Sequence, residues 1–124
     1  TVGGAVVART AEQHDKVRFI MNATGTIMSP QVAFYTLQGC KTLSVRMERQ
    51  SASAMAIAKF LEGHPKVATV RYPGLPSFPQ HALAQRQASG FGAMLWFDVR
   101  GGVAAGKRLM DTIKVWTLAE NLGS

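Results

Sequence analysis

One long helical stretch in the middle of the chain constrains the fold more than any other feature of the sequence. Ser29-Pro30 is a start signal, because serine accepts a hydrogen bond from the first turn and proline there loses no needed N–H. Across residues 31–62 the only weak point is Gly39, and Gly63-His64-Pro65 supplies the stop. A helix this long commonly crosses between domains. The length of 124 residues allows one domain or pieces of two.

An apolar stripe follows one side of this stretch at helical spacing. Its members are Leu43, Met47, Ala54, Ile57, Ala58 and Leu61. Methionine and alanine on such a stripe are typical of core packing, and we expect Met47, Ala54, Met55 and Ala58 to pack in a core and to bind no ligand.

The first thirty residues predict a strand and a shorter helix. Gly3-Gly4 precedes an apolar, β-branched run at residues 5–8, which suits a buried strand. Thr10 can cap a helix over residues 11–23, whose apolar positions recur at helical spacing, and Gly25 marks its end.

The second half of the chain alternates strand and helix signals. The prolines of residues 73–79 predict an ordered loop that ends the first strand. The expected elements are strands at 67–72, 93–99 and 114–117 and helices at 80–87 and 104–112. This order, strand-loop-helix-strand-helix-strand, predicts an α+β layer arrangement.

The net charge of +7 raises the possibility of a basic nucleic-acid-binding module. The fourteen lysines and arginines are spread along the chain without a basic run or a recognised reading motif, which favours a solvated surface. No stretch approaches the roughly 18 apolar residues of a membrane span, and the start has no leader pattern. We therefore expect a soluble, unprocessed protein with neither nucleic acid nor membrane as a partner.

Cys40 is the only cysteine, so the chain can form no internal disulfide, which fits a reducing cytoplasm. It has no histidine partner in motif range, and we expect buried packing for it. The three histidines are too far apart in sequence for a paired zinc motif. Trp96 and Trp116 lie in predicted strands and are expected to be core or sheet-face residues.

The residues alone predict no catalytic constellation. There is no serine-histidine-aspartate set, no P-loop, no metal-ligand pattern and no pair of carboxylates at a useful spacing. Gly3-Gly4 and Gly90-Phe91-Gly92 do not open a helix after a strand, so a phosphate cradle is not predicted. Composition alone therefore predicts no more than a soluble α/β domain.

Several strings in the same order nevertheless resemble one family along the whole chain. They are Gly39-Cys40-Lys41-Thr42-Leu43 with Arg46-Met47-Glu48, Tyr72-Pro73-Gly74-Leu75-Pro76-Ser77 with Pro79-Gln80-His81, Gly90-Phe91-Gly92-Ala93-Met94, and Thr117-Leu118-Ala119-Glu120-Asn121-Leu122-Gly123. Together they resemble the Cys/Met-metabolism pyridoxal-phosphate enzymes of the cystathionine γ-synthase and γ-lyase type.

The resemblance implies an α/β, fold-type I fragment. Residues 1–62 would be the end of the large cofactor domain with the connecting helix, and residues 63–124 the start of the small C-terminal domain. In that family the cofactor lysine lies in a Thr-Lys-aromatic segment before a Gly-Gly like Gly3-Gly4. We therefore expect the lysine to be absent from this chain, and the arginine that binds the substrate carboxylate to lie beyond Ser124.

The activity implied is γ-replacement or γ-elimination on homoserine esters or cystathionine, with pyridoxal 5'-phosphate as the electron sink. The implied protein is a cytoplasmic homo-oligomer, a tetramer, that acts on a small amino-acid substrate. A homoserine-ester sulfhydrylase or a methionine γ-lyase shares most of the same strings and stays open as an alternative branch.

Two site residues follow from the last string. Glu120 matches an acidic position near the distal end of the substrate in the cystathionine-handling branches. Asn121 departs from the family pattern, which has a serine that helps hold the substrate carboxylate and the cofactor lysine. An amide can still donate and accept hydrogen bonds, so Asn121 is expected to bind substrate as well.

Overall fold

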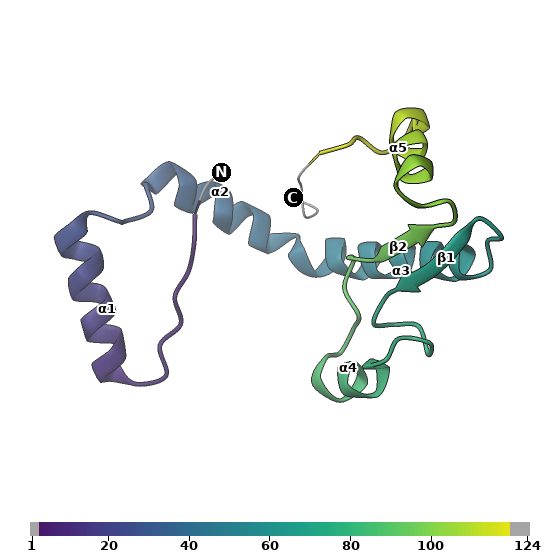
Figure 1. Cartoon of the computed structure of the whole chain (residues 1–124). Coiled ribbons are helices and arrows are strands. Elements are labelled where there is room, and N and C mark those ends of the chain that lie inside the picture. The colour runs from purple at the N-terminus through teal and green to yellow at the C-terminus, as the bar shows by residue number, and fades with distance from the viewer. Residues whose placement is uncertain (1–2, 120–124) are drawn as a thin grey trace. The chain divides into compact units, whose positions relative to one another are not determined.

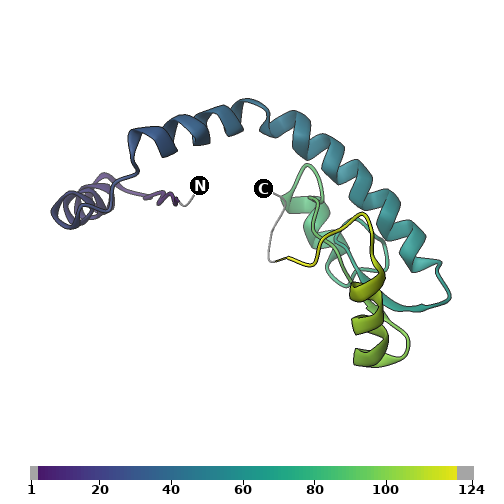
Figure 2. The same ribbon diagram turned by 90° about the horizontal axis from the view of Figure 1, so that it is seen from above.

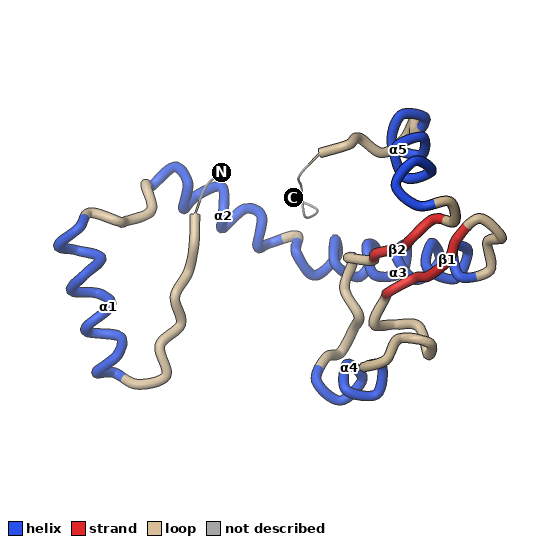
Figure 3. The backbone as a smooth tube through the Cα atoms, viewed as in Figure 1, coloured by secondary structure: helices blue, strands red, loops and turns tan. Residues whose placement is uncertain are grey.

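The structure is a computed structural model that describes residues 3–119. Its elements, in chain order, are α1 Ala11–Thr24, α2 Pro30–Lys41, α3 Leu43–Glu62, β1 Val67–Arg71, α4 His81–Gln87, β2 Trp96–Val99 and α5 Gly102–Thr112 (Figures 1 and 3). The mixture of helices with a small sheet agrees with the expected α/β class.

The chain divides into two compact units, an N-terminal unit, Thr1–Ser44, and a C-terminal unit, Val45–Ser124. The division falls near the start of α3, so most of this helix packs with the second unit. These are units of packing, and the assignment of residues 1–62 to a large cofactor domain stays a prediction.

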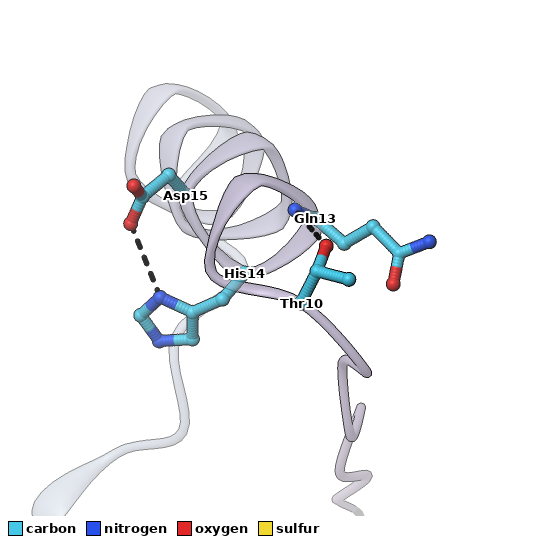
Figure 4. A network of polar contacts seen from close by, with 4 residues as sticks. All are labelled: Thr10, Gln13, His14 and Asp15. Atoms are coloured by element: carbon cyan, nitrogen blue, oxygen red, sulfur yellow. Dashed lines mark hydrogen bonds and ion pairs between the residues drawn. The ribbon is translucent and has the colours of Figure 1, made fainter.

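The N-terminal unit starts its helices where the sequence predicts. Thr10 Oγ1 accepts a hydrogen bond from the Gln13 N–H at 3.3 Å (Figure 4). Gln13 Oε1 in turn accepts a hydrogen bond from the Arg9 N–H at 3.2 Å. Gly25 ends α1 with φ +69°, a left-handed conformation that favours glycine. Ser29 Oγ accepts from the Val32 N–H at 3.3 Å and begins α2.

The long helix predicted for residues 31–62 is interrupted at Thr42, so the prediction of one continuous helix is wrong. Thr42 lies between α2 and α3 with φ −108° and ψ 3°. Its hydroxyl donates to the Gly39 carbonyl at 3.5 Å, and such side-chain bonds compete with the helix backbone. A β-branched residue close to a glycine is therefore a weaker point than glycine alone.

The core of the C-terminal unit lies between α3 and the segment that follows β1. Ala54 and Ala58 of α3 are buried against Tyr72 and Leu75. Packed around them, partly buried, are Met55, Val70, Phe91 and Leu95. The stripe predicted for α3 is thus confirmed as core packing at Ala54, Met55 and Ala58. In Figures 1 and 2 the two strands lie along one side of this helix.

The sheet has two antiparallel strands. Val70 pairs with Phe97 and Arg71 with Trp96, and the register is irregular between Val67 and Thr69. Arg100 extends the pairing, since its N–H donates to the Lys66 carbonyl at 2.8 Å and its Nε donates to the Pro65 carbonyl at 3.1 Å.

Two predicted strands do not form. Residues 5–8 and 114–117 have no regular structure, and Val7 and Val115 are 95% and 84% exposed. The described residues form one sheet, β1 with β2, so neither segment has a neighbouring strand to take its backbone hydrogen bonds. An apolar, β-branched run needs such a neighbour before it becomes a strand.

Predictions of burial for single residues are wrong at two positions. Cys40 is exposed, because α2 buries none of its residues in this chain. Trp116 is 66% exposed and outside any strand, whereas Trp96 is 56% exposed on a face of β2, which fits the sheet-face alternative.

No helix among residues 3–119 has the length and apolar character of a membrane span.

Candidate functional site

Three segments of the family-like strings, residues 72–77, 79–81 and 90–94, meet at one place in the C-terminal unit. Tyr72 is buried at the end of β1, and its hydroxyl donates to the Gly92 carbonyl at 2.9 Å, with the Ser51 carbonyl at 3.4 Å. His81 Nδ1 lies 2.7 Å from the Pro73 carbonyl, so this nitrogen carries the proton. We call Tyr72, Gly74, His81 and Phe91 the Tyr72 cluster.

Aromatic stacking holds the third segment, residues 90–94, against His81. The rings of His81 and Phe91 stack with centroids 5.5 Å apart and an interplanar angle of 29°. Burial raises the pKa of the Tyr72 phenol, because the ionised form would lose its hydration. The phenol therefore keeps its proton for the Gly92 carbonyl, and the hydrogen bonds of the cluster fix the loops before and after α4.

Gly74 is required at this place by the space around it. A Cβ on Gly74 would come within 2.6 Å of Met55 Cε, 2.6 Å of Tyr72 Cε1 and 3.0 Å of Phe91 Cδ2. Any larger residue would have to displace the tyrosine ring from its hydrogen bond. The residues of the Tyr72 cluster lie in strings quoted above, but their meeting in space was not predicted, although a proline-glycine pair directly after a strand was a signal for a tight loop there.

The predicted site residues Glu120 and Asn121 lie outside the residues that the structure describes. Their roles stay predictions. Lys114 and residues 115–119, which precede them, have no regular structure, so no strand positions the motif within the described part of the chain.

The lysines give a direct test of whether the residues present suit pyridoxal phosphate. A lysine that forms an imine with the cofactor must be neutral when it attacks, and proteins achieve this by desolvation or a neighbouring cation. All six lysines are exposed: Lys16, Lys41, Lys59, Lys66, Lys107 and Lys114. Lys16 also pairs with Glu12 at 2.7 Å. None of the six is shielded within the described part of this chain.

None of the other titratable side chains among residues 3–119 is buried. His14 Nδ1 lies 3.2 Å from Asp15 Oδ1, with side chains 62% and 76% exposed (Figure 4). Ser77 donates a short hydrogen bond to Glu62 at the surface. Within residues 3–119 no three histidine, cysteine or carboxylate side chains gather in a way that could hold a metal ion.

The comparisons with known proteins define the class. Residues 1–124 match the family of Cys/Met metabolism PLP-dependent enzymes, and the chain belongs to this family. The expected resemblance and fold are thereby confirmed.

Particular relatives are similar over nearly the whole chain. Cystathionine gamma-lyase of Dictyostelium discoideum is 44% identical over 122 residues, and cystathionine gamma-synthase of Mycobacterium leprae is 46% identical over 122 residues. Each alignment covers 98% of this chain, but only 32% and 31% of those relatives. The chain thus spans about a third of the length of the curated relatives it matches.

A solved structure is also similar to this chain over most of its length. The crystal structure of cystathionine gamma synthase from Xanthomonas oryzae pv. oryzae in complex with cystathionine has a TM-score of 0.90 and 47% identity. The similarity covers 94% of this chain and 30% of that one.

Proposed function

We propose that this chain is part of a pyridoxal-phosphate-dependent enzyme that performs γ-replacement or γ-elimination on homoserine esters or cystathionine. The observation that carries the proposal is the similarity of nearly the whole chain to a cystathionine gamma-lyase and a cystathionine gamma-synthase at 44% and 46% identity. Because these two relatives are equally near, replacement and elimination are both retained.

A second branch has support of its own. L-methionine gamma-lyase of Fusobacterium nucleatum subsp. nucleatum is 43% identical over 124 residues, which is 98% of this chain and 31% of that relative. Methionine is therefore the second candidate substrate. The homoserine-ester sulfhydrylase branch is the other member of this alternative.

We further propose that the lysine that binds the cofactor lies outside these 124 residues, and that the chain alone is inactive. The exposure of all six lysines supports this. The functional protein is proposed to be a cytoplasmic homotetramer with a small amino acid as its substrate, and with no nucleic-acid or membrane partner.

A chimera tests the proposal. In the Dictyostelium discoideum relative, the matched segment is replaced by this chain, and the unaltered relative serves as the control. We expect the chimera to bind pyridoxal phosphate, seen in its visible absorbance, and to form a 2-oxo acid from cystathionine. A cofactor-bound chimera without turnover of cystathionine, a homoserine ester or methionine would refute the proposed function. The same exchange in the Mycobacterium leprae relative covers a failure to fold.

Glu120 and Asn121 are proposed to bind substrate, and the chimera gives the setting for their variants. If Glu120 attracts the distal ammonium of cystathionine, Glu120→Ala should lower kcat/KM for cystathionine. The expected decrease corresponds to a loss of about 0.5–2 kcal/mol of transition-state stabilisation, and the loss should be smaller for smaller substrates. Asn121→Ser should be tolerated, since both side chains hydrogen-bond a carboxylate, whereas Asn121→Leu should cost more. Steady-state kinetics unchanged in all three variants would make Glu120 an ordinary surface acid.

A further inference from the structure

A histidine ring takes part in the turn that joins α3 to β1. His64 Nδ1 accepts a hydrogen bond from the Lys66 N–H at 3.2 Å. In the same turn the His64 carbonyl accepts from the Val67 N–H at 3.0 Å, and the His64 N–H donates to the Leu61 carbonyl at 3.1 Å. We call residues 64–67 the His64 turn.

The bond between His64 and Lys66 requires one protonation state of the ring. A ring nitrogen accepts a hydrogen bond only when it carries no proton, so His64 is neutral in this turn, with its proton on Nε2. A second proton on the ring would occupy Nδ1 and would place two N–H groups against each other. The protonated ring therefore cannot keep this bond, and the Lys66 N–H loses its acceptor.

The other two histidines respond to a proton differently. His81 Nδ1 donates to the Pro73 carbonyl, and a protonated ring would still donate there. His14 Nδ1 lies beside Asp15 Oδ1, a contact that a proton on the ring strengthens. Histidine is the side chain that ordinarily changes its charge between about pH 5 and 8. A change of pH in this range therefore removes a hydrogen bond at His64 and leaves the contacts of the other two in place.

The charged groups around His64 are all cations. His64 is half-buried and lines a hollow between α3, β2 and α5. The charged side chains that line the same hollow, with no carboxylate among them, are Arg49 of α3, Arg108 of α5, and Lys66 and Arg100 beside the strands. Positive charges on all three elements repel a further positive charge in the hollow.

Two features near the ring act in the opposite direction. The carbonyl end of α3, which ends at Glu62, attracts a cation, and so does the face of the Phe60 ring, whose centroid lies 5.5 Å from that of His64. Neither feature supplies an acceptor for the Lys66 N–H. Whichever influence on the charge is larger, protonation of His64 removes the bond.

We propose that the His64 turn is a pH-sensitive element of the fold. Neutral His64 closes the turn, and protonated His64 releases the Lys66 N–H as the pH falls from about 8 to about 5. The change is local, because the Val67 N–H keeps the His64 carbonyl, whose oxygen accepts in both protonation states. The consequence is a looser connection between α3 and β1 at low pH. The proposal does not depend on which reaction the enzyme performs.

Nuclear magnetic resonance of the ¹⁵N-labelled 124-residue chain tests the proposal across this pH range. We expect the Lys66 amide resonance to shift with the same midpoint as the His64 ring. The protection factor of the Lys66 amide against hydrogen exchange should fall by roughly threefold or more, since a bonded N–H becomes free. The Val67 amide is the internal control, and its protection factor should change by less than about 1.5-fold.

Variants of His64 separate the acceptor from the proton. In His64→Asn the side-chain oxygen can accept from the N–H two residues on, and it takes up no proton in this range. The Lys66 amide should therefore stay protected at every pH. His64→Leu removes the acceptor, so the Lys66 amide should lack protection even at the upper end of the range. His14→Asn is the matched control and should respond to pH like the unaltered chain.

Three results would overturn the proposal. The first is a Lys66 amide that does not respond to pH in the unaltered chain, which would mean that the ring nitrogen is not its acceptor. The second is an equal response in His64→Asn, which would assign the change to another titrating group. The third is an equal loss of protection at Val67, which would show that the whole turn unfolds and that the change is not local.

Discussion

Gly74→Ala should lower the free energy of unfolding of the C-terminal unit by about 2–3 kcal/mol, because it overpacks the Tyr72 cluster. The added methyl group would stand 2.6 Å from Tyr72 Cε1 and 3.0 Å from Phe91 Cδ2. Met55 can move its flexible end away, but the tyrosine ring is held by its hydroxyl on the Gly92 carbonyl and the Phe91 ring by its stack on His81.

Urea unfolding followed by far-ultraviolet circular dichroism measures the change. Gly90→Ala is the matched control, since Gly90 lies in the same group of strings and a Cβ there meets nothing within 4 Å. The control should change stability by less than about 0.5 kcal/mol. A loss as large in Gly90→Ala as in Gly74→Ala would show that the close contacts around Gly74 are not the cause.

Tyr72→Phe should cost about 1–2 kcal/mol of the same unfolding free energy. The ring and its packing remain, but the Gly92 carbonyl loses the donor that lies 2.9 Å away. Tyr35→Phe is the control, because Tyr35 is 52% exposed on α2. A neutral effect of Tyr72→Phe in urea unfolding would mean that the hydrogen bond contributes nothing to the cluster.

The same tyrosine predicts a dependence on pH. Its pKa is raised in the folded chain because burial disfavours the phenolate. The stabilisation is therefore fully present below the unfolded value of about 10 and is lost as the pH rises through the folded value, since the unfolded chain releases its proton first. The unfolding free energy should fall more steeply above pH 10 in the unaltered chain than in Tyr72→Phe. Equal slopes would contradict the burial of the phenol.

The helices were predictable from the sequence because their ends are encoded locally. Thr10, Gly25 and Ser29 act as caps where the sequence placed them, and α3 ends at Glu62, directly before the predicted stop at Gly63. The break at Thr42 was missed, since it depends on a side-chain hydrogen bond that helical periodicity does not report.

The strands were predicted less well because a strand depends on a partner far away in sequence. Residues 67–71 pair with β2. Residues 5–8 and 114–117 have no partner strand among the described residues. The exposure of Cys40 and Trp116 has a related cause, since neither lies against a core within this chain.

The candidate site was predictable only in part. The family strings were correctly grouped, but sequence order could not show that Tyr72, His81 and Phe91 meet in space. That meeting depends on the path of the loops around α4, which packing decides. The substrate-binding roles of Glu120 and Asn121 are predicted from the resemblance alone.

The most direct test of the central claim locates the cofactor lysine in the chimera with the Dictyostelium discoideum relative. The chimera is loaded with pyridoxal phosphate and reduced with borohydride, and its peptides are analysed by mass spectrometry. We expect one stoichiometric pyridoxyl-lysine in the relative's part of the chimera. Full modification of Lys16, Lys41, Lys59, Lys66, Lys107 or Lys114 would contradict the claim that this chain is a part of the enzyme without the cofactor lysine.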